Sequence, residues 1–484
     1  MKEIIYVSLV LLLLGSCAED KGNYDYKKVN VISIEGIEPS YTVDSYDTLT
    51  IEPSLTFALL EERDVSYEWM INNKVVATSL NLHVPVEEKL GTYQGQLCVT
   101  DNQTNLKYYS SFGVQVKTSF TQAFFVLSEK ENGEATISYQ RQDKKGSPFV
   151  HHIYENANEG FGSLGTRPKQ IKYKSNLQAT KFFMILCEGG DKKMVMLNYS
   201  DMTMASFINE TGVSGSEGAA FNPTFVDLYL SGAVISNGKI HCFNYSNSKT
   251  MYRAGIGDYD LVDWVGANRN LHSKCWVSFD KLSRKFVLLS VGDDPFAFDK
   301  FEYIDSGDIS FANQEFIAGG YSATNQNESM KEFVMWDRAN DKCYFYSLEI
   351  TYKQGEQAGV TIVETPIVKN AEYEGLLTDN SVCMMAPKLM YWYISSGGIL
   401  WRIHKEGGTP EKIFESLHGD ITSMMVNGKD ETKIFVATYD PQSQNEHKGT
   451  ITVLSTDKKI GENLLGEFEG ACDKAVSMTY TGNW

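Results

Sequence analysis

The chain has 484 residues, with 62 acidic and 44 basic side chains and a formal net charge of −18. This negative charge argues against binding to nucleic acid or to an anionic lipid surface, because both need basic patches. Aromatic residues make up 12% of the chain, and it has 39 glycines. Because long segments of helical periodicity are few, this composition predicts an all-β protein of two folded units.

The first seventeen residues have the pattern of an export signal. Met1-Lys2-Glu3 precedes an apolar run from Ile4 to Leu14, which ends in Gly15-Ser16-Cys17. A charged start, an apolar core too short to span a bilayer and small residues before a cleavage site are typical of a signal peptide. A cysteine directly after these residues resembles the lipobox of bacterial lipoproteins. The resemblance implies a signal peptide over residues 1–16, acylation of Cys17 and lipid anchoring to the outer membrane.

Residues 17–28 are polar and contain too few apolar side chains to fold, so they form a lipidated tether. Glu19-Asp20 directly follows the acylated cysteine. This pair resembles the export signal that sends lipoproteins to the cell surface in bacteria with SusC/SusD-type uptake systems. A plain solvated linker is the alternative interpretation.

Residues 29–117 alternate apolar and polar side chains with a period of two, as half-buried strands do. Leu49 and Ile51 share one face of a predicted strand, and Trp69 lies near the middle of the segment. Short strands around a central tryptophan predict an immunoglobulin-like β-sandwich with Trp69 between its sheets.

Four stretches in this region carry a family resemblance: the lipobox, Asp20-Lys21-Gly22-Asn23-Tyr24-Asp25-Tyr26, Asp47-Thr48-Leu49-Thr50-Ile51-Glu52-Pro53 and Tyr67-Glu68-Trp69. Together they resemble the PKD-like family of surface lipoproteins over roughly residues 1–117. The resemblance implies a PKD-like sandwich and a SusC/SusD-like outer-membrane complex as partner. It names no catalytic residue.

Residues 118–484 repeat one unit, which is an apolar strand, a Gly/Asn/Asp turn and a second strand. Seven such strands begin at intervals of roughly 50 residues, at Phe124, Phe182, Val234, Phe286, Phe333, Tyr391 and Ile434. A repeat of this size made of hairpins predicts a seven-bladed β-propeller.

The segment Ala475-Val476-Ser477-Met478 resembles an inner strand but has no hairpin after it. We expect it to pair with the first hairpin and close the ring, which would remove exposed sheet edges. Two consecutive β-sandwiches are the alternative layout.

The sequence contains no local catalytic or metal-binding motif that we recognise, so it predicts no catalytic residues, metal or cofactor. An acidic run could offer oxygen ligands to structural calcium, but its spacing fits no EF-hand and favours solvated turns. Its members are Asp293, Asp294, Asp299, Glu302, Asp305 and Asp308. The seven cysteines after Cys17 are expected to be buried free thiols, because their number is odd and most lie in apolar runs.

Aromatic rings on loops can serve as binding platforms for sugars or peptides. The candidates are Trp264, Tyr154, Phe161, Phe221 and Tyr321. Trp264 is the most suggestive, because it ends the segment Asp258-Tyr259-Asp260-Leu261-Val262-Asp263-Trp264, whose carboxylates suit hydroxyls or amines beside the ring. Simple packing between blades is the alternative for each ring.

These features predict a non-catalytic cell-surface lipoprotein that assists a SusC/SusD-like nutrient importer. It would capture an oligosaccharide or a peptide, or dock on the transporter as a structural subunit. The alternative is a surface hydrolase built on a propeller, either a glycosidase or a peptidase, because carboxylates that meet across blades leave no local spacing to read.

Overall fold

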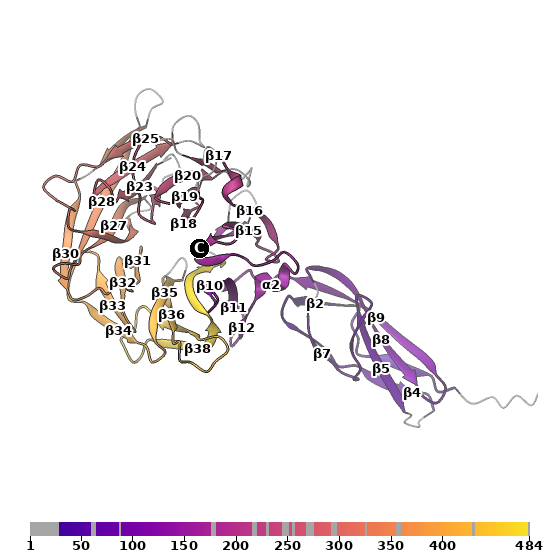
Figure 1. The fold of residues 1–484 in the computed structure, drawn as a ribbon. Helices are drawn as coiled ribbons and strands as arrows, with labels where there is room; N and C mark the ends of the chain where they lie inside the picture. Colours follow the sequence, from indigo (N-terminus) through magenta and orange to yellow (C-terminus); the bar gives the residue numbers. More distant parts are fainter. Residues whose placement is uncertain are drawn as a thin grey trace, which may run out of the picture. The chain divides into compact units, whose positions relative to one another are not determined.

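The computed structural model describes residues 29–484 except 60–63, 87–88, 176–180, 215–219, 229–231, 244–250, 254–256, 268–274, 292–297, 325–326, 355–359, 365, 428–430 and 483–484. The predicted signal peptide, the lipidation site Cys17 and the tether to residue 28 lie outside the described residues. The chain divides into two compact units, Met1–Lys117 and Thr118–Trp484 (Figure 1). Within the described residues, no helix has the length and hydrophobicity needed to cross a membrane.

The first unit consists of a five-stranded sheet and two strand pairs. The sheet order is β2-β9-β8-β5-β6, and the pairs are β1-β4 and β3-β7. Strand β2 runs parallel to β9, whereas the other described pairings are antiparallel. The strands are β1 (Ile32–Glu35), β2 (Ser40–Asp44), β3 (Thr48–Ile51), β4 (Ser54–Phe57), β5 (Val65–Ile71), β6 (Lys74–Ala77), β7 (Leu82–Pro85), β8 (Gly91–Asp101) and β9 (Leu106–Lys117).

Trp69 lies at the centre of this unit, as predicted. Its side chain is fully buried in a cluster that includes Leu49 and Ile51 of β3. The indole N–H donates to the carbonyl of Ser79 at 2.9 Å, and the ring meets Phe112 edge-on at 5.8 Å. Burying this ring with its one donor satisfied stabilises the contact between the layers without leaving an unpaired polar group.

The described part of the second unit contains seven sheets of four or five strands. The predicted apolar strands that begin the seven hairpins fall in seven different sheets, which confirms the hairpin pattern.

In sheet order along the chain, the strands of this unit are β10 (Ala123–Glu129), β11 (Ala135–Arg141), β12 (Phe149–Val150) with β39 (Lys474–Tyr480); β13 (Thr166–Ser175), β14 (Lys181–Gly189), β15 (Met194–Asn198), β16 (Met204–Ile208); β17 (Val213–Ser214), β18 (Pro223–Asp227), β19 (Ala233–Ser236), β20 (Lys239–Phe243), β21 (Met251–Arg253); β22 (Gly266–Ala267), β23 (Cys275–Asp280), β24 (Lys285–Val291), β25 (Phe298–Tyr303); β26 (Glu315–Thr324), β27 (Asn327–Asp337), β28 (Lys342–Gln354), β29 (Val360–Glu364), β30 (Val368–Glu374); β31 (Cys383–Ala386), β32 (Tyr391–Ser396), β33 (Ile399–His404), β34 (Glu411–Glu415); and β35 (Asp420–Val426), β36 (Lys433–Tyr439), β37 (Gly449–Ser455), β38 (Leu464–Cys472). The described helices are α2 (Ile153–Ala157) and the 3-10 turn η1 (Glu210–Gly212).

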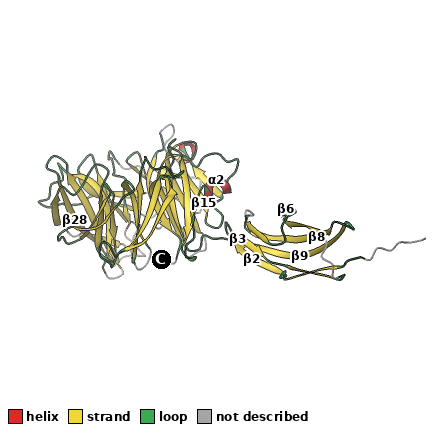
Figure 2. Ribbon diagram, turned by 90° about the horizontal axis from the view of Figure 1, so that it is seen from below, coloured by secondary structure: helices red, strands yellow, loops and turns green. Residues whose placement is uncertain are grey.

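The sheets of the second unit lie side by side around a common centre (Figure 1), and Figure 2 shows them from below. Their inner-edge strands, at one end of each sheet order, are β39, β13, β18, β22, β26, β31 and β35. Contacts join β39 to β13, β13 to β18, β22 to β26, β26 to β31, β31 to β35 and β35 to β39.

The last strand completes the first sheet. Strand β39 pairs antiparallel with β10, with Phe124 opposite Tyr480 and Val126 opposite Met478. The predicted pairing of the terminal segment with the first hairpin is therefore confirmed. Because β10 is covered on this side by β39, the sheet has no open edge at β10.

Side chains also satisfy backbone groups on the inner-edge strands. The backbone N–H of Ile171 donates to the hydroxyl of Ser477 at 3.2 Å, and that of Val226 donates to the Gln170 side-chain oxygen at 2.7 Å. These bonds link neighbouring sheets at positions where no ladder partner is available. They also connect the inner-edge strands β39, β13 and β18 to one another.

The core of the second unit lies between the sheets. Trp276 and Trp392 are fully buried, Trp336 is buried, and Trp401 packs against the same cluster as Trp392. All seven predicted thiols are free, and six of them are buried as predicted, whereas Cys383 is half-buried; they are Cys98, Cys187, Cys242, Cys275, Cys343, Cys383 and Cys472.

Candidate functional site

A polar pocket of about 300 Å³ lies where three successive sheets of the second unit meet. The described residues that line it are Arg167, Glu188, Asn222, Thr224, Asn237, Gly238, Asp260, Asp263 and Lys281. They come from β13 and β14, from the β18 to β20 segment, and from the chain around β22 and β23. The pocket is therefore made by tertiary packing, and no continuous stretch of sequence encodes it.

The turn Asn237-Gly238 forms one wall of the pocket. Both residues have positive φ angles, 51° and 68°, as a tight two-residue hairpin between β19 and β20 requires. A Cβ atom on Gly238 would lie 1.8 Å from the Asp260 carboxylate oxygen Oδ1. Only glycine therefore provides both the backbone conformation and the space that Asp260 occupies.

Asp260 is held from two sides. Its backbone N–H donates to Oδ1 of the buried Asp280 at 2.8 Å, and its carboxylate pairs with Lys281 Nζ at 3.0 Å. The next backbone N–H, that of Leu261, donates to the carbonyl of Gly238 at 2.8 Å. The pocket carboxylate is thus fixed to both the hairpin turn and the end of β23.

Asp280 stabilises the turn that follows β23 and carries Lys281. Its carboxylate also accepts from the backbone N–H groups of Leu282 and Ser283, both at 3.2 Å. These hydrogen bonds lower the pKa of Asp280 although its burial acts in the opposite direction and is the largest single influence. Asp280 therefore stays ionised and keeps the turn that carries Lys281 in place.

Asp263 is exposed and accepts a hydrogen bond from the hydroxyl of Thr224. Its neighbour Trp264 does not line the pocket. The indole is half-buried and meets Phe333 edge-on at 5.5 Å, and a Cβ on Gly319 would lie 2.4 Å from it. The tryptophan therefore packs between β22 and β26, where it anchors the segment that presents Asp263.

Arg167 and Glu188 form the opposite wall. Arg167 Nε lies 3.4 Å from a Glu188 carboxylate oxygen, and Lys169 Nζ lies 3.3 Å from the other. The Arg167 side chain is 61% exposed, so solvent screens the pair and its guanidinium remains accessible.

The structure does not bring the predicted aromatic rings together, and none of them lines this pocket. The predictions for Tyr154 and Phe221 are wrong, because these rings are 0% and 2% exposed and offer no face to a ligand. Large aromatic side chains such as these are often buried. The loop-like sequence around them does not indicate that burial. Phe161 is 62% exposed, and Tyr321 is half-buried in β26.

Sequence reasoning singles out the segment that carries Asp260 and Asp263 but misses the charged residues that line the pocket with them. Arg167, Glu188 and Lys281 lie far apart along the chain and belong to no motif. The one local signal is Asn237-Gly238, which predicts a turn but does not reveal a pocket wall.

Of the acidic run considered for calcium, Asp293 and Asp294 lie outside the described residues, and the side chain of Asp299 is not described. Asp305 accepts from the backbone N–H of Gly307 at 2.9 Å, as a turn residue does. Among the residues that the structure does describe, no group of three or more His, Cys, Asp or Glu side chains is arranged to hold a metal ion.

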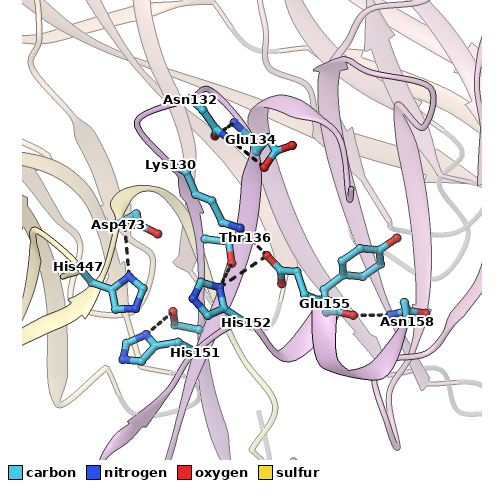
Figure 3. A network of polar contacts seen from close by, with 12 residues as sticks. Lys130, Asn132, Glu134, Thr136, His151, His152, Glu155, Asn158, His447 and Asp473 are labelled. Carbon is cyan, nitrogen blue, oxygen red and sulfur yellow. Dashed lines mark hydrogen bonds and ion pairs between the residues drawn. The ribbon is translucent and has the colours of Figure 1, made fainter. Parts of the chain in front are cut away.

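A histidine cluster joins the first and last sheets of the second unit (Figure 3). His151 follows β12, and His447 lies between β36 and β37. Their rings stack with centroids 4.0 Å apart and 24° between planes. Oδ1 of Asp473, which directly precedes β39, lies 3.3 Å from His447 Nδ1. The hydroxyl of Ser138 lies 3.1 Å from His151 Nδ1, also at hydrogen-bond distance.

The two stacked rings differ in their affinity for protons. Burial, together with the nearby charges of His447 and His152, lowers the pKa of His151 from 6.5 to about 4. Hydrogen bonding to Asp473 raises the pKa of His447. The two pKa values are therefore shifted in opposite directions, so that His151 loses its proton at lower pH than His447 does.

A second pocket of about 290 Å³ lies near this junction. Its lining residues are Glu129, Lys130, Glu131, Gly133, Tyr439 and Lys474. Lys130 pairs with Glu155 at 2.8 Å, and Lys448 pairs with Glu131. The first pocket is the stronger candidate, because it contains the carboxylates of the predicted binding segment.

Comparison with known proteins adds one family match. Residues 17–168 match the PKD-like family. This match supports the resemblance predicted for the N-terminal region and extends past the first unit. No curated protein matches the chain.

Several solved structures are similar to the chain at low identity. A quinonprotein alcohol dehydrogenase-like protein from Bacteroides thetaiotaomicron is 12% identical, with a TM-score of 0.46 and coverage of 91% of this chain and 96% of that one. An auxiliary nutrient binding protein from the same organism is 8% identical, with a TM-score of 0.28 and coverage of 76% and 95%. Because both TM-scores are below 0.5, these likenesses decide neither the architecture nor the activity of this chain.

Proposed function

We propose that this chain is a lipid-anchored protein of the outer-membrane surface that binds an oligosaccharide or a peptide without cleaving it, in support of a SusC/SusD-like importer. The observation that carries the proposal is the polar pocket at the meeting point of three sheets. Its lining offers three carboxylates, two cationic side chains, two amides and a hydroxyl. Convergent polar groups in a concave site are the usual means of recognising a small polar ligand.

The proposed body of the binding unit is a seven-bladed β-propeller closed by β39. Support for it comes from the seven described sheets, from the contacts between inner-edge strands and from the pairing of β39 with β10. Such a scaffold places loops from neighbouring blades at one face, where they can form a pocket without altering the core.

Hydrogen bonds hold the segment at Asp260 in place in the absence of a ligand. Backbone hydrogen bonds tie the segment at Asp260 to the hairpin turn on one side and to β23 on the other. A site that is already ordered loses little conformational entropy when a ligand arrives. Weak affinity would suffice, because proteins tethered next to an importer act at a high effective concentration.

A surface glycosidase or peptidase is the second candidate, because Glu188, Asp260 and Asp263 share one pocket. Paired carboxylates are the usual catalytic groups for glycoside cleavage. However, Glu188 and Asp260 each already lie in an ion pair with a cationic side chain.

Calorimetry separates these functions. The chain from residue 18 onward, which contains every described residue, is titrated with oligosaccharide and peptide panels, and the same mixtures are analysed for products. Heat without products supports capture. Cleaved products would replace the binding function with the hydrolase. If there is neither heat nor cleavage, co-purification with a SusC/SusD-like complex would instead support a structural subunit.

Location is tested separately through Cys17. Protease treatment of intact cells should remove the protein, and Cys17→Ala should release it from the membrane fraction, because acyl chains supply the hold on the bilayer. A wild-type protein that stays protected in intact cells would place it inside the outer membrane and refute the surface assignment.

A further inference from the structure

We propose, building on the binding function above, that the pocket binds peptides through a protonated amine and that Asp263 is the carboxylate that takes it. The starting point is the balance of charge in the lining. Arg167 and Lys281 are positive, whereas Glu188, Asp260 and Asp263 are negative.

Each cation of the lining lies beside a carboxylate other than Asp263. Lys281 Nζ lies 3.0 Å from Asp260, and Arg167 Nε lies 3.4 Å from Glu188. Among the described residues, no cationic side chain lies within ion-pair distance of Asp263, whose hydrogen-bond partner is the neutral hydroxyl of Thr224. Among the described residues, Asp263 is therefore the one carboxylate of the lining without an ion-pair partner, and an ammonium group is its natural complement.

The position of Asp263 is fixed before a ligand arrives. On one side the hydroxyl of Thr224 in β18 holds its carboxylate, and on the other the packed ring of Trp264 holds its backbone. The backbone N–H of Val262 also donates to the carbonyl of Phe279 at 3.0 Å. A carboxylate with this support keeps its direction, which gives an ion pair more specificity than a freely rotating surface side chain would.

The remaining lining favours a peptide over a sugar. The described residues around the pocket include no aromatic ring on which a sugar face could stack. Hydroxyl groups of a neutral sugar would not balance the charge of Asp263, and amino sugars lose theirs when they are acetylated. The two amide side chains in the lining already bond to each other, with Asn222 Nδ2 donating to Asn237 Oδ1 at 2.9 Å. What an unblocked peptide adds is the ammonium group at its N-terminus.

The test compares ligands that differ only in the amine. The purified protein is titrated by calorimetry with unblocked tetraglycine, with N-acetylated tetraglycine, with a chitosan oligomer that carries free amines and with a neutral oligosaccharide of similar length. We expect heat from unblocked tetraglycine and at least 10-fold weaker binding after acetylation, because a charge-assisted hydrogen bond is lost.

Asp263→Asn tests the residue, because it keeps the shape and the bond from Thr224 while removing the charge. It should weaken binding of unblocked tetraglycine by about 10-fold to 100-fold. Asp258→Asn is the matched control. Asp258 lies in the same segment and is 96% exposed, but it does not line the pocket. It should leave binding unchanged, and both variants should melt like the original protein.

The other outcomes overturn the proposal in distinguishable ways. If the neutral oligosaccharide binds and unblocked tetraglycine does not, the amine assignment is wrong while the binding function stands. Chitosan binding without peptide binding would keep the amine but refute the peptide. If Asp263→Asn and Asp258→Asn change binding equally, Asp263 is not part of the site. If no ligand of the panel produces heat, both the ligand class and the proposed pocket are refuted.

Discussion

The buried ion pair between Glu332 and Lys405 allows a quantitative test of how the sheets of the second unit are held together. Glu332 lies in β27 and is 1% exposed, and Lys405, directly after β33, is 7% exposed. Lys405 Nζ lies 3.2 Å from Glu332 Oε1, which also accepts a hydrogen bond from the Ser322 hydroxyl at 2.8 Å. The pair therefore bridges two neighbouring sheets inside the core.

Burial raises the pKa of Glu332, although Lys405 and Ser322 act to lower it. The loss of hydration is thus not fully offset by the ion pair. In such cases breaking the pair costs about 3–5 kcal/mol, whereas replacing both partners with apolar residues is close to neutral or stabilising. Glu332→Leu should therefore destabilise the unit by about 3–5 kcal/mol, and adding Lys405→Met should recover most of that loss.

Differential scanning calorimetry of the four proteins in the double-mutant cycle measures the effect. At about 2.1 cal/mol/K of unfolding entropy per residue, a unit of about 370 residues should melt roughly 4–6 °C lower for such a loss. The double variant should melt within about 2 °C of the original protein. If the two single losses simply add in the double variant, the residues are not coupled and the reasoning fails.

Three further changes test the junction, the pocket wall and ring closure. The pKa of His151 is depressed to about 4 from about 6.5, so the stability that the neutral ring contributes above pH 6.5 is lost as the pH falls toward 4. In urea titrations, His151→Phe should therefore reduce by about 1–2 kcal/mol the loss in free energy of unfolding between these pH values. This figure is discounted because the ring is half-exposed. The raised pKa of His447 acts in the opposite direction, since its contribution to stability is present at low pH and is lost as the pH rises. If the stability of His151→Phe depends on pH as that of the original protein does, the assignment to His151 is wrong. Gly238→Ala should displace Asp260 and lower stability by about 1–2 kcal/mol together with any ligand affinity, and a variant with normal melting and normal binding would refute the steric account. Deleting residues 473–484 should lower the melting temperature severely, because β10 loses its pairing with β39. Deleting only residues 483–484 is the control. If both deletion variants melt at the same temperature, closure by β39 is refuted.

The fold can be predicted in part because its signals are local. Alternation of side chains with a period of two follows directly from strand geometry, so the spacing of Leu49 and Ile51 is enough to assign both residues to one face. Turn residues with positive φ, such as Asn237-Gly238, mark hairpins for an equally local reason. The pairing of β39 with β10 can be inferred because a strand without a hairpin needs a distant partner.

The burial of individual rings cannot be predicted in the same way. Tyr154 and Phe221 are surrounded by loop-like sequence, and yet both are buried. Trp264 is held by Gly319, which is 55 positions away and which the sequence does not connect to it. The exposure of an aromatic ring depends on which neighbouring sheet covers it, and this is decided by packing between sheets.

What the sequence alone determined, therefore, is the all-β class, the hairpin pattern of the second unit and the candidate segment with Asp260 and Asp263, two residues that line the polar pocket. Only the tertiary structure decided that Arg167, Glu188 and Lys281 line one pocket with those carboxylates and that the ring of Trp264 packs between sheets. The physical reason is one of range. Strand and turn preferences act over a few residues, whereas a pocket between three sheets depends on contacts between segments that are far apart along the chain.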